Sequence, residues 1–92
     1  MNAQPYKSTP EFDERSLPEA LRNRHSTKAG VWGLLRVIEG EVRLVFEDPP
    51  RVVQVTPGAP AEIAPQAWHH VETSGPMRMH VEFYREKPLG DG

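Results

Sequence analysis

The sequence predicts a small all-β domain, a barrel or a sandwich, with one short helix near its N-terminus. From position 31 onward, short segments rich in β-branched and other apolar residues follow one another along the chain. Clusters of Pro, Gly, Asp and Ser separate these segments, a pattern typical of strands joined by tight turns. Prolines at positions 57, 60 and 65 lack a backbone donor and fix φ, so segment 57–71 cannot be helical.

The N-terminal third is predicted to contain an arm, a short helix and a loop. Residues 1–12 are polar and include two prolines, which favours an extended arm. Ser16 is placed to cap a helix, and Glu19 lies three residues further on, where it can reach back to the cap. These signals predict a helix over about residues 17–23. Residues 24–30 are polar without periodicity and are predicted to form a loop.

Six strands are predicted after this loop. Segment 31–38 is rich in β-branched and aromatic residues, and segment 42–46 alternates apolar with mostly non-apolar residues. A turn at Glu39-Gly40-Glu41 is expected to join these two strands into a first hairpin. The chain ends in a segment, 86–92, that we expect to be a flexible tail. The remaining strands are predicted at 51–55, 61–64, 67–72 and 77–85, separated by Pro- and Gly-containing turns.

Ninety-two residues predict a single domain, 1–92, with a small core, because a chain of this length buries only about 60% of its unfolded surface. The chain has no cysteine, so stability must come from sheet closure, a bound ion or a partner subunit, and we expect a homodimer. Eleven basic and thirteen acidic residues are interspersed, which argues against nucleic-acid binding. The sequence shows neither a signal peptide nor 18 successive apolar residues, so we expect a cytoplasmic protein that does not bind membranes.

The residues best suited to chemistry are histidines. Three of the four lie in the last third of the chain, near Glu82, whereas nucleophile-elbow, phosphate-loop and dinucleotide motifs are missing from the sequence. Two imidazoles and one carboxylate suit zinc, iron, nickel or manganese and leave positions open for a substrate. An antiparallel connection through Ser74-Gly75-Pro76 would bring His69 close to Glu82. A buried histidine often satisfies a backbone carbonyl instead, so His25 and His69 also fit a structural role.

Strand alternation adds a constraint. His69 and His70 are adjacent and must face opposite sides, so we expect His70 to face solvent. The same alternation divides the last strand into a core row, Met77, Met79, Val81 and Phe83, and an opposite row, Arg78, His80, Glu82 and Tyr84. Glu82 then faces solvent, lines a polar pocket with its own row, or reaches the metal site through a polar barrel mouth or a bulge. Trp32 and Trp68 either bracket a ligand or fill the core.

Six segments spread over about residues 5–86 carry a family resemblance: STPEF (8–12), LPEAL (17–21), RHSTKAGVWG (24–33), VIEG (37–40), PQAWHHV (65–71) and VEFYR (81–85). Together they resemble the TehB/YeaR-like family of small single-domain cupins, once called tellurite-resistance proteins. The resemblance implies a jelly-roll barrel (double-stranded β-helix) with one short N-terminal helix. It also implies a divalent transition metal held by His25, His69 and Glu82, with His80 as a weaker fourth candidate.

The sequence departs from the wider cupin pattern, which has a His-x-His pair and a Glu before the first hairpin's glycine. Here only His25 precedes Gly40, and Trp32 or Gly33 stands about where the Glu would be. The resemblance implies a stress-response protein, related to tellurite, other oxyanions or nitrogen oxides, or a protein that binds an unidentified small molecule. In an enzyme, the open metal positions would favour oxygen or hydrolytic chemistry.

Two alternatives stay open. One is a metal-free ligand-binding or accessory module whose pocket is closed by Trp32, Trp68 and Tyr84. The other is an interaction module whose N-terminal arm adds to the edge of a partner's sheet.

Overall fold

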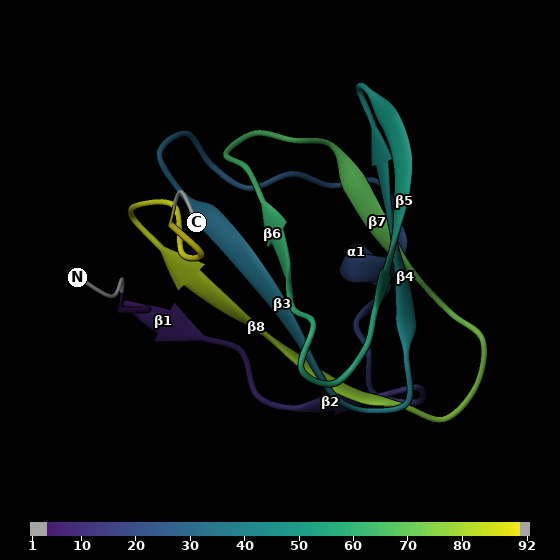
Figure 1. Cartoon of the computed structure of the whole chain (residues 1–92). Coiled ribbons are helices and arrows are strands. Elements are labelled where there is room, and N and C mark those ends of the chain that lie inside the picture. The colour runs from purple at the N-terminus through teal and green to yellow at the C-terminus, as the bar shows by residue number, and fades with distance from the viewer. Residues whose placement is uncertain (1–3, 91–92) are drawn as a thin grey trace.

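The computed structural model describes residues 4–90, which form two antiparallel sheets and one short helix (Figure 1). The first sheet contains, in spatial order, β1 (Lys7–Ser8), β8 (Arg78–Tyr84), β3 (Trp32–Glu39) and β6 (Ala61–Ile63), and β2 (Phe12–Asp13) also pairs with β8. The second sheet contains β5 (Pro50–Val55), β4 (Val42–Glu47) and β7 (His69–Thr73). The helix α1 (Glu19–Arg22) packs near β7. The prediction of a mostly β domain with one short helix is confirmed.

All six predicted strands are present, within two residues of their predicted bounds, but they pair differently. The predicted hairpin between segments 31–38 and 42–46 is wrong, because β3 pairs with β6 and β8 while β4 pairs with β5 and β7. The predicted pairing of β7 with β8 is wrong for the same reason. The connection from β3 to β4 and the connection from β7 to β8 each carry the chain from one sheet to the other. His69 therefore lies opposite Phe46, and Glu82 lies opposite Leu34.

The turn from β3 to β4 depends on Gly40. Its φ of +72° lies in the left-handed region, and a Cβ there would overlap the carbonyl oxygen of Pro76 and lie 3.1 Å from the Met77 Cα. Pro76 and Met77 belong to the connection from β7 to β8. The crossing from β3 to β4 is therefore in contact with the crossing from β7 to β8, and only glycine allows this approach.

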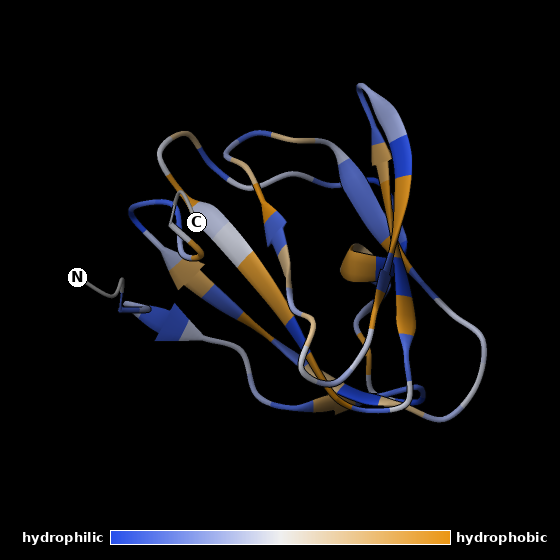
Figure 2. Ribbon diagram, in the orientation of Figure 1, coloured by the Kyte–Doolittle hydropathy of each residue, from blue (hydrophilic) through white to orange (hydrophobic). Residues whose placement is uncertain are grey.

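The hydrophobic core lies between the two sheets. Alternating residues of β4 (Val42, Leu44 and Phe46) are buried, and Figure 2 shows the resulting alternation of hydrophobic and hydrophilic segments along the strands. The predicted core row of the last strand is confirmed, since Met77, Met79 and Val81 are buried and Phe83 packs against the same cluster. Complete burial of one leucine side chain contributes about 1.5–3 kcal/mol, so this interface is the main source of stability.

The helix is shorter than predicted, and the predicted Ser16 cap is wrong. Pro18 precedes the first helical residue, and no side chain caps the helix. Ser16 instead belongs to a turn in which the Asp13 carboxylate accepts hydrogen bonds from the amides of Arg15 and Ser16, both at 2.8 Å. The Ser16 and Arg15 amides lower the pKa of Asp13. The Ser16 hydroxyl oxygen in turn accepts a hydrogen bond from the Asp13 amide at 2.9 Å, so it is engaged in this turn and not at the helix.

The N-terminal arm extends the first sheet of its own chain. The amide of Tyr6 donates to the Phe83 oxygen, and the amide of Thr9 donates to the Val81 oxygen, both at 2.9 Å. At the other end, Lys87 Nζ and the Leu89 amide bind the Glu62 carboxylate at 2.7 and 2.8 Å. Residues 1–3 of the predicted arm and 91–92 of the predicted tail lie outside the described residues. Within residues 4–90, none of the helices has the length and apolar character needed to cross a membrane.

Candidate functional site

A cavity of about 300 Å³ lies between the two sheets. Its walls are apolar side chains of both sheets and of the segment before β3: Val31, Leu35, Ile63, Val71, Val81 and Phe83. Gly33 also lines the cavity, and a Cβ there would lie 3.4 Å from the Ile63 side chain, in van der Waals contact with it. Exposed Lys7 from the arm and exposed Lys28 from the 25–28 loop line its rim.

His25 and His69 form the polar end of this cavity. Their backbones exchange two hydrogen bonds of 2.9 Å, from each amide to the other residue's carbonyl oxygen. Their ring centroids are 4.1 Å apart, with an angle of 58° between the planes. The structure therefore brings together two of the three residues predicted to bind a metal, although one comes from a loop and the other from β7.

Both imidazoles are held in the same way. His25 Nδ1 lies 2.8 Å from the Asn23 oxygen, and His69 Nδ1 lies 2.7 Å from the Ala67 oxygen. A carbonyl oxygen only accepts hydrogen bonds, so each Nδ1 carries a proton and donates it. In the neutral ring, Nε2 then keeps its lone pair. A hydrogen bond from the other ring nitrogen to a carbonyl oxygen is common in histidines that bind metals.

Burial keeps His69 neutral. The residue is 2% exposed, and Phe46 packs beside it with a centroid distance of 5.9 Å. The pKa of His69 is lowered from 6.5 to about 4: burial is the largest cause, the hydrogen bond to Ala67 opposes it, and the nearby His25 and His70 contribute to the lowering. The Nε2 lone pair of His69 is therefore available at neutral pH.

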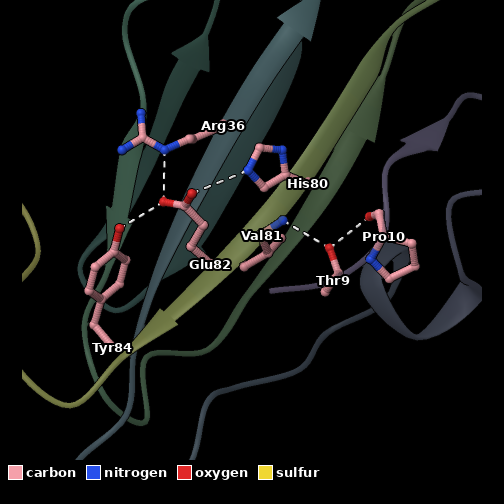
Figure 3. A network of polar contacts seen from close by, with 7 residues as sticks. All are labelled: Thr9, Pro10, Arg36, His80, Val81, Glu82 and Tyr84. Atoms are coloured by element: carbon pink, nitrogen blue, oxygen red, sulfur yellow. Dashed lines mark hydrogen bonds and ion pairs between the residues drawn. The ribbon is translucent and has the colours of Figure 1, made fainter. Parts of the chain in front are cut away.

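Glu82, the third predicted ligand, lies on the opposite face of β8 from the cavity, and Figure 3 shows it between Arg36, His80 and Tyr84. Its Oε1 accepts hydrogen bonds from Arg36 Nε at 2.8 Å and from the Tyr84 hydroxyl at 2.7 Å, and its Oε2 lies 3.4 Å from His80 Nε2. Burial acts to raise the pKa of Glu82, but the hydrogen bonds from Arg36, Tyr84 and His80 outweigh it and lower the pKa. The carboxylate is therefore ionised and already bound by side chains of its own face.

The structure does not assemble the predicted set of His25, His69 and Glu82. A bulge does occur where β3 pairs with β8, but it lies between Val37 and Glu39 on β3, at the far end from Glu82, and leaves the alternation of β8 intact. In the described part of the chain, no three His, Cys, Asp or Glu side chains are grouped so that they could hold a metal ion. The imidazole pair is thus the part of the predicted site that the fold brings together.

The aromatic residues predicted to close a pocket lie elsewhere. Trp68 is 43% exposed, with the Arg24 guanidinium 3.9 Å above its ring. Trp32 lies 5.9 Å from the Lys87 ammonium, and Tyr84 is buried beside Glu82; none of the three lines the cavity.

His70 behaves as predicted. It points away from His69 and lies 2.9 Å from a carboxylate oxygen of Glu72. This confirms the alternation inferred for the two adjacent histidines.

Sequence reasoning missed the part played by Thr27. Its hydroxyl accepts a hydrogen bond from the Gln66 amide at 3.1 Å and donates one to the Ala64 oxygen at 3.3 Å, which fixes the 25–28 loop to the turn before β7. The signal available was a short polar segment that carries both a histidine and a hydroxyl residue. The loop is therefore held in place although it has no regular structure.

A family model for the TehB-like domain matches residues 7–81. The chain belongs to the TehB-like family. It is 33% and 32% identical, over 88 residues, to proteins of Haemophilus influenzae strains 10810 and ATCC 51907 described as probable S-adenosyl-L-methionine-dependent methyltransferase TehB. These matches cover 89% of this chain but only 31% of each relative.

Two solved structures are similar to this TehB-like chain. The structure of YeaR from Escherichia coli K12 superposes with a TM-score of 0.81 and 25% identity, covering 90% of both chains. The structure of TehB from Haemophilus influenzae gives a TM-score of 0.79 and 30% identity, covering 90% of this chain and 31% of TehB. The chain is related to the N-terminal domain of TehB.

Proposed function

We propose that this chain is a small-molecule-binding domain with a cupin-type barrel, whose ligand occupies the cavity between the two sheets. We further propose that His25 and His69 hold a divalent transition-metal ion at the polar end of that cavity. The observation that carries this proposal is the matched geometry of the two imidazoles. Each donates Nδ1–H to a backbone carbonyl, both rings border one cavity, and His69 is buried and neutral.

The donor chemistry of this pair fits zinc, iron, nickel or manganese, since neutral imidazole is a common ligand of each. Two protein ligands are fewer than the three of most catalytic zinc sites, so water and the small molecule would complete the coordination. When bound, such an ion polarises an oxygen of its exogenous ligand. The chain's own contribution is to fix both imidazole tautomers through Asn23 and Ala67, and to exclude water with the apolar cavity walls.

A metal-free binding module is the second candidate function. It is favoured by the position of Glu82, which is held by Arg36 and Tyr84 on the other face of the sheet. In this candidate, the imidazoles would act only as hydrogen-bonding groups for the ligand. For either candidate, the similarity to part of a methyltransferase related to tellurite resistance supports an accessory role in a stress response.

Metal titration of protein purified without an affinity tag tests the proposal. Protein freed of metal with EDTA should bind one equivalent of Zn²⁺ or Ni²⁺ per chain by calorimetry, and plasma mass spectrometry should find the ion after desalting. His25→Gln and His69→Gln should each weaken binding at least tenfold, since each removes one of two imidazoles. His70→Gln is the matched control and should change nothing, because His70 points out of the cavity. Substoichiometric metal that His69→Gln does not alter would favour the metal-free module.

A further inference from the structure

The cavity has an unusual balance of charge. Sixteen described residues line it, among them two lysines and two histidines, and none is an aspartate or a glutamate. The whole chain has thirteen acidic against eleven basic residues, so the lining is depleted in carboxylates relative to the rest of the molecule. A positively charged rim without nearby carboxylates favours an anionic occupant.

The two rim lysines are available to such a ligand. The chain has three lysines, and Lys87 binds Glu62 at 2.7 Å outside the cavity. Among residues 4–90, neither Lys7 nor Lys28 is within 4.0 Å of a carboxylate oxygen, although both are exposed. An ammonium group that is not already paired can bind an anion without breaking an existing ion pair.

The walls of the cavity restrict the anion further. Eight aliphatic or aromatic side chains line the cavity, including Leu35, Ile63 and Val81, which are almost completely buried. The volume of about 300 Å³ is at the lower end for small-molecule sites, which suits one ring or a branched aliphatic group. A small inorganic oxyanion would lose its hydration against these walls and gain no apolar contact.

We propose that the cavity binds a small organic carboxylate, with its apolar body between the sheets and its carboxylate at the rim formed by Lys7 and Lys28. This inference rests on the cavity being the binding site of the proposed function, but it does not require the ion. It assigns the class of ligand and places two positioning residues, Lys7 and Lys28, at the rim of the cavity.

Benzoate is the probe, because its ring fits the volume and its carboxylate matches the rim. Amide chemical shifts of the EDTA-treated protein would be followed as benzoate is added. Saturable shifts of Ile63, Val71 and Val81 are expected, with binding at least tenfold tighter than that of benzamide, which has the same shape without the charge. Acetate and tellurite, which lack an apolar body, should also bind at least tenfold more weakly.

Lysine variants test the rim separately. Lys28→Gln should weaken benzoate binding about threefold, the effect of removing one exposed ion pair, and leave benzamide binding unchanged. Lys87→Gln is the matched control and should change neither. Equal binding of benzamide, equal binding of acetate or tellurite, or an absence of saturable shifts would each overturn the inference.

The same titration distinguishes this inference from the proposed metal site. Zinc binding through His25 and His69 without benzoate binding would overturn the ligand class and leave the metal site standing. Benzoate binding to protein that takes up no zinc would support the ligand class and overturn the ion.

Discussion

Metal-free protein should lose stability between pH 6.5 and 4 because of His69. In the unfolded chain this histidine has its ordinary pKa of about 6.5, whereas burial lowers its pKa to about 4 in the folded protein. Between these values the unfolded state binds a proton that the folded state does not, so acidification favours unfolding. Lowering the pH through the whole window costs about 3 kcal/mol, and lowering it from 7 to 5 costs about 2 kcal/mol.

Urea denaturation in the presence of EDTA measures this effect at pH 7, 6 and 5. His69→Asn is the informative variant, because asparagine places an amide nitrogen near the position of Nδ1 and can still donate to the Ala67 oxygen, but does not titrate. Its free energy of unfolding should fall by about 2 kcal/mol less than that of the parent protein between pH 7 and 5. His70→Asn replaces the neighbouring, partly exposed histidine of the same strand and shows how much of the difference belongs to the buried position.

Between pH 7 and 5, the change in stability caused by His69 can be distinguished from the change caused by the carboxylates. Asp13, Glu72 and Glu82 have lowered pKa values, so the stability that they contribute is present above their unfolded pKa and is lost only as the pH falls below about 4. Equal slopes for the parent protein and His69→Asn over pH 7 to 5 would refute the argument. That result would mean that His69 is protonated in the folded protein, or that it is not buried there.

Three further predictions use matched variants. Gly40→Ala should lower the free energy of unfolding in urea by about 3 kcal/mol. Gly58→Ala should lower it by only about 1 kcal/mol, because Gly58 has φ +83° but open space around it. Similar losses for the two variants would contradict the contact between Gly40 and the Pro76–Met77 segment. Glu82→Gln should leave zinc affinity within twofold of the parent value in calorimetry, whereas His69→Gln should lower it at least tenfold; a tenfold loss for Glu82→Gln would place that carboxylate at the ion. Thr27→Val should lower the free energy of unfolding by about 1 kcal/mol in the same urea experiment, because two hydrogen bonds between the 25–28 loop and the turn before β7 are lost. An unchanged free energy of unfolding would mean that other contacts hold the loop.

The strands of this domain could be predicted from sequence because their signal is local. The alternation in segment 42–46 and the prolines that break it depend only on neighbouring residues, and the strand forms where they indicate. The core row of β8 could be predicted for the same reason, since Met79 and Val81 alternate with polar residues and are buried.

Strand pairing could not be predicted in this way. A short turn containing glycine fits a hairpin and also fits a crossing between two sheets, since the left-handed Gly40 would suit either connection. The difference lies in a contact distant in sequence, between Gly40 and the Pro76–Met77 segment, and no local pattern reports it. The assumption that strands adjacent in sequence pair was therefore wrong for β3 with β4 and for β7 with β8. The expected proximity of His69 and Glu82 was wrong for the same reason.

The residues of the candidate site also differ in how far local sequence could place them. His69 could be placed because its strand position forces it inward while His70 points outward. His25 lies in a loop without periodicity, so its position beside His69 was implied by the family resemblance, and the two backbone hydrogen bonds that create it are visible only in the structure.

Glu82 shows the converse. Its neighbours Val81 and Phe83 had already placed it on the outer face, and a strand that keeps its alternation cannot present both a core row and a carboxylate to one cavity. In the metal site that we propose, the third donor would therefore be water or the bound small molecule, whose identity would decide the chemistry of the cavity.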